Sequence, residues 1–207
     1  MCSSDLRPVA AVGGVGGACV PRRVPAAGPS SPRTAAVSPA PGRATIATVY
    51  IDSMEFLDEE RDGWAPFEAL DTLTDEQLSV PQADAHGWSG RDLMAHLTFW
   101  LEVARDVARE LAVNETSPAK RRSDEEWERR GDEWNDTVVA AWRELPMDEV
   151  RNRFRQVPGE LRGYLTVVPE SRWLKHPEHL RFFLTEMTDH YEAHGADLRA
   201  ILAGTGR

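Results

Sequence analysis

Apolar side chains recur at helical spacing along almost the whole chain after Ser53. No stretch alternates apolar and polar positions for long enough to predict a strand. The first helix is expected at about residues 54–71, with an inner side formed by Leu57, Trp64, Phe67 and Leu70. The pattern therefore predicts an all-α fold, and the next question is how many helices it contains.

Ser89 and Asp92 predict the start of a second helix, because serine is a good N-cap and an acidic side chain is favourable in the first turn. This helix is expected to run to about Val113. Its inner positions are Leu93, His96, Trp100, Val103, Val107 and Leu111.

Ser123 and Glu126 form a capping-box pattern, which predicts a third helix that ends near Pro146. Apolar positions continue at helical spacing over residues 147–168, where Pro158 and Gly159 predict a kink or a break. The last helix is expected at about residues 179–203. Together these segments predict an up-and-down four-helix bundle with an extra helical segment around residues 147–168.

Residues 1–53 differ in composition from the rest of the chain. They hold seven of the 14 prolines and six of the 15 glycines, and none of the seven tryptophans or six phenylalanines. Such a segment cannot bury enough apolar surface to offset its ordering entropy, so we expect a disordered, low-complexity tail and a folded domain at residues 54–207. The tail can be a signal peptide or read-through upstream of a true start at Met54, and the onset of the helical pattern at Met54 favours the second.

Charge and cysteine content restrict the possible functions. The tail contains five arginines and two aspartates, so the total of −10 places −13 on the remaining residues. A domain this acidic repels nucleic acid and anionic lipid, and the sequence contains no membrane-length apolar stretch. We therefore expect a cytoplasmic protein without either partner. Both cysteines lie in the tail, at Cys2 and Cys19, so the folded domain has no thiol of its own.

Three histidines interrupt the inner faces of two expected helices. His190 and His194 are spaced i and i+4, which places both imidazoles on one face, and His96 occupies an inner position of the second helix. Three neutral imidazoles can bind a divalent ion and leave positions open for water or substrate. The alternative is three core histidines, each of which would need its own hydrogen-bond partners.

The segments around these histidines resemble the DinB-like superfamily, which includes the metal-binding domain of mycothiol-dependent maleylpyruvate isomerases and the ClbS/DfsB proteins. The matching stretches are residues 87–97 with Trp100, and residues 189–199. The resemblance covers essentially all of residues 54–207. It implies that His96, His190 and His194 bind one metal ion, usually zinc or nickel in that superfamily.

The resemblance also implies a function. The preferred hypothesis is a metal-dependent transferase, isomerase or detoxifying enzyme that acts on a small molecule and uses a low-molecular-weight thiol such as mycothiol. One alternative is a ClbS/DfsB-type protein that sequesters a small molecule or a metal without turnover. Another is a bundle whose main role is to form a homodimer. The sequence assigns no catalytic residue.

Other polar and aromatic residues have more than one interpretation. Glu186 is a candidate fourth ligand, ligand partner or base, although a solvated carboxylate is the simpler interpretation. Trp88 and Trp100 can wall a pocket or belong to the core. The remaining residues are interpreted as loop, cap or surface positions, and they are His86, His176, His179, Asp189 and Glu192.

Overall fold

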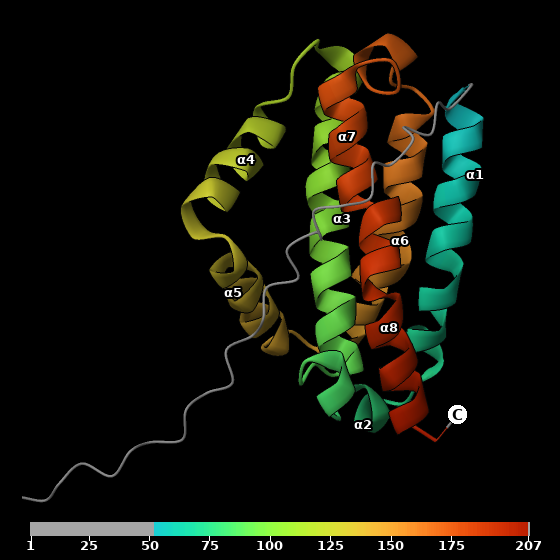
Figure 1. The fold of residues 1–207 in the computed structure, drawn as a ribbon, viewed down its shortest axis with the longest axis vertical. Coiled ribbons are helices and arrows are strands. Elements are labelled where there is room, and N and C mark those ends of the chain that lie inside the picture. The colour runs from blue at the N-terminus through green and yellow to red at the C-terminus, as the bar shows by residue number, and fades with distance from the viewer. Residues whose placement is uncertain (1–51, 207) are drawn as a thin grey trace, which may run out of the picture. The chain divides into compact units, whose positions relative to one another are not determined.

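The computed structural model describes residues 52–206, and these are helical without any strand (Figure 1). The predictions for residues 1–51 lie outside the described residues. The α-helices are α1 Ser53–Trp64, α2 Asp75–Leu78, α3 Gly90–Val113, α4 Pro118–Arg130, α5 Asp132–Arg143, α6 Met147–Leu165, α7 Pro177–Glu186 and α8 Thr188–Gly204. Short 3₁₀ helices cover Ala65–Thr72, Ala83–Ala85 and Glu170–Arg172.

The long helix α3 runs through the centre of the fold, and α6 packs along it (Figure 1). Helix α1 and the consecutive helices α7 and α8 complete a bundle around these two. The core is apolar and rich in aromatic contacts, such as that between Trp64 and Phe154, whose ring centroids lie 4.8 Å apart. The predicted all-α helical bundle is confirmed.

The membership of the bundle differs from the prediction. The segment after Pro146 was expected to be an extra helical segment outside the four-helix bundle, but it forms the bundle helix α6. Helices α4 and α5 instead lie outside the bundle and pack against α3 (Figure 1). Burial explains the difference, because Ser123 is the one buried residue of α4. Helix α6 instead buries Val150, Phe154, Val157, Pro158, Leu161 and Leu165.

The predicted capping box at Ser123 and Glu126 is wrong. Helix α4 begins at Pro118, because the Ser117 side chain accepts a hydrogen bond from the Lys120 amide and proline is favourable at the first helical position. Gly131, with φ of 52°, then separates α4 from α5. The single helix expected over this stretch is therefore two helices that meet at a left-handed glycine.

Two further expectations about helix continuity differ from the structure: the segment with Pro158 is not broken, and the last helix is. Helix α6 continues through Pro158 as one element, whereas the expected last helix is interrupted at Met187, where φ is −122° and ψ is −95°. The interruption separates α7, which ends at Glu186, from α8, which carries His190 and His194.

The predicted start of α3 is confirmed at the level of individual atoms. Ser89 and Asp92 form a reciprocal capping box, and Arg143 of α5 donates two hydrogen bonds of 2.7 and 2.9 Å to the Asp92 carboxylate. Burial alone would raise the pKa of Asp92, but the hydrogen bonds from Arg143 and Ser89 outweigh it, so that the pKa lies below 3.8. This cap fixes the helix that carries His96.

Helix α1 begins one residue before the predicted start. Asp52 is its N-cap and accepts hydrogen bonds from the amides of Met54 and Glu55, while the Ser53 amide donates to Glu170. The folded unit therefore uses residues on the N-terminal side of Met54.

A buried polar network links α1, α6 and α8. Glu60 is completely buried, and its carboxylate accepts hydrogen bonds from the Arg162 guanidinium and, at 2.9 Å, from the Tyr191 hydroxyl. Burial and the neighbouring Glu60 carboxylate raise the pKa of Tyr191 well above 10. The network fixes which side of α8 faces α1.

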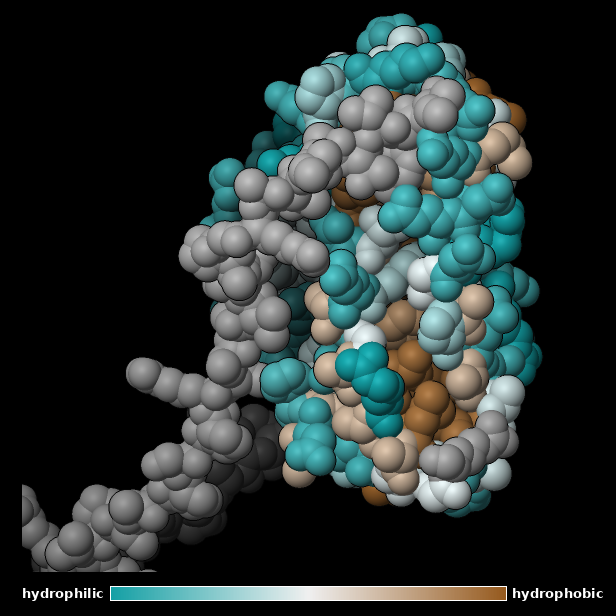
Figure 2. All heavy atoms as spheres, turned by 45° about the vertical axis from the view of Figure 1, so that its right-hand side comes forward, coloured by the Kyte–Doolittle hydropathy of each residue, from teal (hydrophilic) through white to brown (hydrophobic). Residues whose placement is uncertain are grey.

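A groove between α1 and α8 lies on the Tyr191 side of α8, and Phe67 and Leu198 contribute to its lining. In Figure 2, hydrophobic residues gather in the lower half of the face that turns forward from the view of Figure 1. No helix among residues 52–206 is long and apolar enough to cross a membrane.

The Asp92 cap yields a prediction about stability. Asp92→Asn should lower the free energy of unfolding by about 2 kcal/mol at pH 7, because it removes a carboxylate that accepts charged hydrogen bonds. Since the pKa of Asp92 is lowered on folding, this contribution exists above pH 3.8 and is lost as the pH falls through the folded-state pKa. Urea unfolding of both proteins between pH 7 and pH 3 measures the difference.

Asp58→Asn is the matched control, because Asp58 forms an exposed ion pair with Arg61 on α1. Its effect should stay below about 0.5 kcal/mol. A loss for Asp92→Asn no larger than this would contradict the assigned role of the cap.

Candidate metal centre

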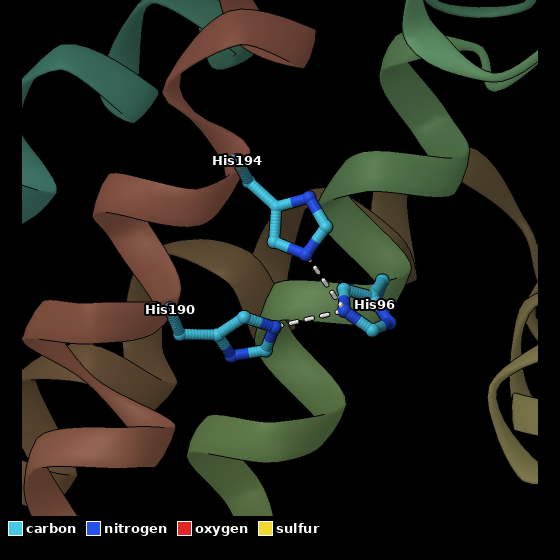
Figure 3. Close-up of side chains that lie close together, drawn as sticks. All are labelled: His96, His190 and His194. Atoms are coloured by element: carbon cyan, nitrogen blue, oxygen red, sulfur yellow. Dashed lines mark hydrogen bonds between the residues drawn. The ribbon is translucent and has the colours of Figure 1, made fainter. Parts of the chain in front are cut away.

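Three histidines converge between α3 and α8 (Figure 3). Nε2 of His96 lies 2.8 Å from Nε2 of His190 and 3.1 Å from Nε2 of His194. His96 comes from α3, whereas His190 and His194 stand one turn apart on α8. We call these residues the histidine triad, and their ligand atoms all lie within 4.8 Å of one another.

The surroundings of the triad favour neutral imidazoles. His96 is buried, and its burial, together with the nearby His190 and His194, lowers its pKa well below 6.5. Burial and the neighbouring His194 lower the pKa of His190 to about 3, although the main chain of Glu186 opposes this shift. Neutral imidazole is the form of histidine that can bind a metal ion.

Asp197 determines the tautomer of His194. Its carboxylate is buried and lies 2.8 Å from Nδ1 of His194, while its other oxygen lies 3.7 Å from Nε2 of the exposed His86. A carboxylate only accepts hydrogen bonds, so Nδ1 of His194 carries the proton and Nε2 carries a lone pair. A carboxylate behind a histidine is the usual arrangement around metal-ligating histidines.

The protons available cannot satisfy all three facing nitrogens. Nε2 of His96 lies near two other Nε2 atoms but can carry only one proton, and Nε2 of His194 carries none. In addition, Nδ1 of His96 and Nδ1 of His190 have no hydrogen-bond partner of good geometry among residues 52–206. A cation bonded to the three lone pairs would resolve the conflict at the centre, so the donor set fits a metal ion.

The distances between the ligand nitrogens of the triad are also close to those in a metal site. Two nitrogens bonded to one ion at about 2.1 Å each can be at most about 4.2 Å apart. The widest separation in the triad is no more than 4.8 Å, so binding requires a shift of about half an ångström at most.

Trp88 covers the triad from the loop before α3. Its ring stacks on His194 with a centroid distance of 5.6 Å and an interplanar angle of 19°, and it lies 4.8 Å from His96. Trp88 is partly buried and also packs against the hydrophobic core, so it contacts both the histidine site and the core.

The other candidates are placed outside the triad. Glu186 does not belong to the cluster of converging ligand atoms, and Asp189 and Glu192 are exposed. His176 caps α7, as expected, by accepting a hydrogen bond from the amide of His179. His179 itself is buried, so its interpretation as a surface residue is wrong.

Comparison with known families adds to this geometry. A family model described as the mycothiol maleylpyruvate isomerase N-terminal domain matches residues 57–199. The chain belongs to this family. The match includes all three triad histidines and Asp197. Searches of the curated proteins and of the solved structures found no match.

Membership of the mycothiol maleylpyruvate isomerase N-terminal domain family agrees with the fold and with a metal-binding function, since the family is metal-binding. Sequence reasoning found the three histidines but missed Asp197. The signal was present, because an acidic residue three positions after His194 lies on the same side of the helix.

The Asp197 contact predicts the tautomer of His194. In the full-length chain stripped of metal with a chelator, the imidazole ¹⁵N spectrum of His194 should show a protonated Nδ1 and an unprotonated Nε2 at pH 7. Asp197→Asn should remove this preference, because an amide can also donate a hydrogen bond to Nδ1.

Asp189→Asn is the control, since the exposed side chain of Asp189 should leave the spectrum of His194 unchanged. A predominantly Nε2-protonated His194 in the unsubstituted chain would contradict the proposed role of Asp197.

Proposed function

We propose that this chain is a divalent-metal enzyme that uses a low-molecular-weight thiol of the mycothiol type to modify a small molecule, as a transferase or an isomerase. The observation that carries the proposal is the convergence of three Nε2 atoms, with His96 placed 2.8 and 3.1 Å from the other two. The family match, which names mycothiol, supports the choice of thiol.

His96, His190 and His194 would hold the ion, and Asp197 would orient His194. Three imidazoles suit zinc or nickel, and three protein ligands leave room for a further ligand. When bound, the ion lowers the pKa of a thiol or a water molecule, which makes either a stronger nucleophile at neutral pH.

The absence of thiols from the folded residues supports a thiol cosubstrate. Cys2 and Cys19 are the only cysteines, and both lie outside residues 52–206. In a thiol addition, the S–H bond breaks, a C–S bond forms at an electrophilic carbon, and the proton passes to the substrate. This step requires no oxidant or reductant.

The chain's own residues orient the reacting groups and limit access to them. Asp197 holds the proton of His194 on Nδ1, and Trp88 covers His96 and His194 from one side. Burial keeps His96 and His190 uncharged, so neither repels a cation.

The cytoplasmic location and the formation of a homodimer, which were both expected from the sequence, stay predictions.

Metal analysis of the purified full-length chain tests the site. We expect close to one zinc or nickel ion per chain, and a loss of at least 90% of it in each of His96→Ala, His190→Ala and His194→Ala, because two imidazoles do not hold such an ion stably. Asp197→Asn should weaken affinity by about 10- to 100-fold, as loss of a carboxylate behind a ligand usually does.

His176→Asn is the matched control, because it changes a histidine outside the triad and asparagine keeps the helix cap. It should retain the full metal content. A folded, metal-free native chain after growth with zinc and nickel would refute the metal site.

Turnover tests the role of the thiol. The metal-loaded chain should consume an electrophile in the presence of mycothiol at least tenfold faster than mycothiol alone, and His96→Ala should abolish the difference. Stoichiometric binding of the electrophile without turnover would instead indicate a sequestering protein.

A further inference from the structure

The side of α8 that faces away from the triad carries a stripe of small and charged residues. Residues three, four or seven positions apart lie on one side of a helix. On this side of α8 the stripe consists of Thr188, Glu192, Gly195, Ala196, Arg199 and Ala203, and we call it the outer stripe. Four of these residues are exposed, and the other two, Thr188 and Gly195, are partly buried. The outer stripe has no apolar side chain larger than that of alanine, so a second helix can approach α8 closely along it.

The outer stripe borders an open groove. The groove lies between α1 and α8, and its volume is about 600 Å³. Four residues of the outer stripe contribute to its lining, namely Thr188, Glu192, Gly195 and Arg199. Helix α8 ends at the bottom of the bundle (Figure 1), and hydrophobic residues gather in the lower half of the face that Figure 2 shows. The groove and the outer stripe together form a face that another helix can occupy.

The packing of the described residues gives no reason for a glycine at position 195. A Cβ atom on Gly195 would meet only the far end of the Arg199 side chain, at 3.5 Å, which is an ordinary contact distance. Gly204, the other glycine of α8, differs, because a Cβ atom there would lie 2.1 Å from the side chain of Gln82. Glycine inside a helix lowers its stability relative to alanine, and it allows another backbone to come close. Gly195 therefore favours close contact with a second molecule.

The outer stripe carries one acid and one base. Glu192 and Arg199 are seven residues apart, which is about 10 Å along the helix axis. Neither forms an ion pair with any other described residue. A partner that is only cationic or only anionic would match one of these charges and repel the other. A partner that carries the same two charges in the reverse order matches both.

A second copy of this chain presents the two charges in the reverse order when its α8 lies antiparallel to the first. A two-fold axis between Gly195 and Ala196 places Gly195 opposite the partner's Ala196. Glu192 then faces the partner's Arg199, and by symmetry Arg199 faces the partner's Glu192. The outer stripe therefore complements itself, both in charge and in the small size of the residues at its centre.

The antiparallel order also separates the acidic parts of the two copies. Helices α1 and α8 run in the same direction (Figure 1), and Glu59 and Asp62 of α1 line the groove together with Glu192. Two copies in parallel order would bring these carboxylates together, which is unfavourable. In the antiparallel order they lie beside the part of the partner's α8 that carries Arg199.

We propose that the outer stripe is the interface of a homodimer, in which the α8 helices of two copies pack antiparallel with Gly195 at their closest approach and two Glu192–Arg199 ion pairs around it. The interface is small, so the dissociation constant should lie in the micromolar range. The proposal goes beyond the proposed function, because it requires neither the metal ion nor the thiol. It gives the homodimer expected from the sequence a specific surface, and it leaves the triad on the opposite side of α8.

Sedimentation velocity of the full-length chain at about 5 to 500 μM, a range suited to a weak interface, tests the proposal. We expect a reversible equilibrium between monomer and dimer. Glu192→Arg and Arg199→Glu should each weaken dimerisation at least tenfold, because each substitution places like charges opposite each other at both contacts. An equimolar mixture of these two variants should form a heterodimer, because both contacts then join opposite charges.

Further variants separate the interface from general effects on the fold. Gly195→Leu should weaken dimerisation at least tenfold, because the leucine side chain keeps the two helices apart. Gly163→Leu on α6 is the matched control, since a Cβ atom there would meet nothing within 4 Å. Glu128→Arg on the exposed side of α4 is the control for the change of charge. Both controls should dimerise like the unsubstituted chain, and circular dichroism should show the same helix content in all variants.

A chain that stays monomeric at all of these concentrations would overturn the proposal, since the outer stripe would then belong to a different partner. Dimerisation that survives Gly195→Leu and both charge reversals would also overturn it, because the dimer would use another surface. Failure of the two mixed variants to associate would refute the antiparallel order. Dimerisation as expected, in a chain that fails the metal and turnover tests, would uphold the interface and refute only the proposed function.

Discussion

The hydrogen-bonded network of Glu60, Arg162 and Tyr191 is the interaction on which the site depends most. Tyr191 lies between His190 and His194 in the sequence, but its side chain points to α1 while the histidines point to α3. The network therefore fixes the rotation of α8 from the side opposite to the triad. Breaking a buried charged network of this kind usually costs several kcal/mol, so rotation of α8 away from α3 is strongly opposed.

Much of the fold could be predicted because helical periodicity is a local signal. The start of α3 at Ser89 and the inward position of His96 follow from residues within one or two turns. The start of the helix that follows Ser117 was harder to predict. Two cap patterns compete there, and the structure uses Ser117 with Pro118, since Ser123 is buried within the helix. Which segment joined the bundle depended on total buried apolar surface, which single motifs do not report.

The candidate site was predictable in its ligands and less so in its surroundings. The i, i+4 spacing of His190 and His194 indicates a ligand pair, and the inner position of His96 on its helix suggests the third ligand. The resemblance then supported the same three residues. Glu60 and Arg162 left no signal, because 102 residues separate them and charged residues on helices are normally solvated. Glu186 is only partly exposed, and burial raises its pKa to about 8. Asp124 and Lys120 of α4 contribute to this environment, and the sequence does not reveal the position of α4.

The interruption at Met187 has an electrostatic consequence for the triad. Because α7 ends at Glu186, a new helix begins at Thr188, and His190 lies in the first turn of that helix. The peptide dipoles of α8 add up to a partial positive charge at this end. This partial positive charge lies beside His190, so a positive charge on the His190 imidazole becomes less favourable. An unbroken helix would have placed His190 in a helix interior, where this effect is absent. The break therefore adds a contribution that disfavours a charged His190, while the main chain of Glu186 at the end of α7 acts in the opposite direction.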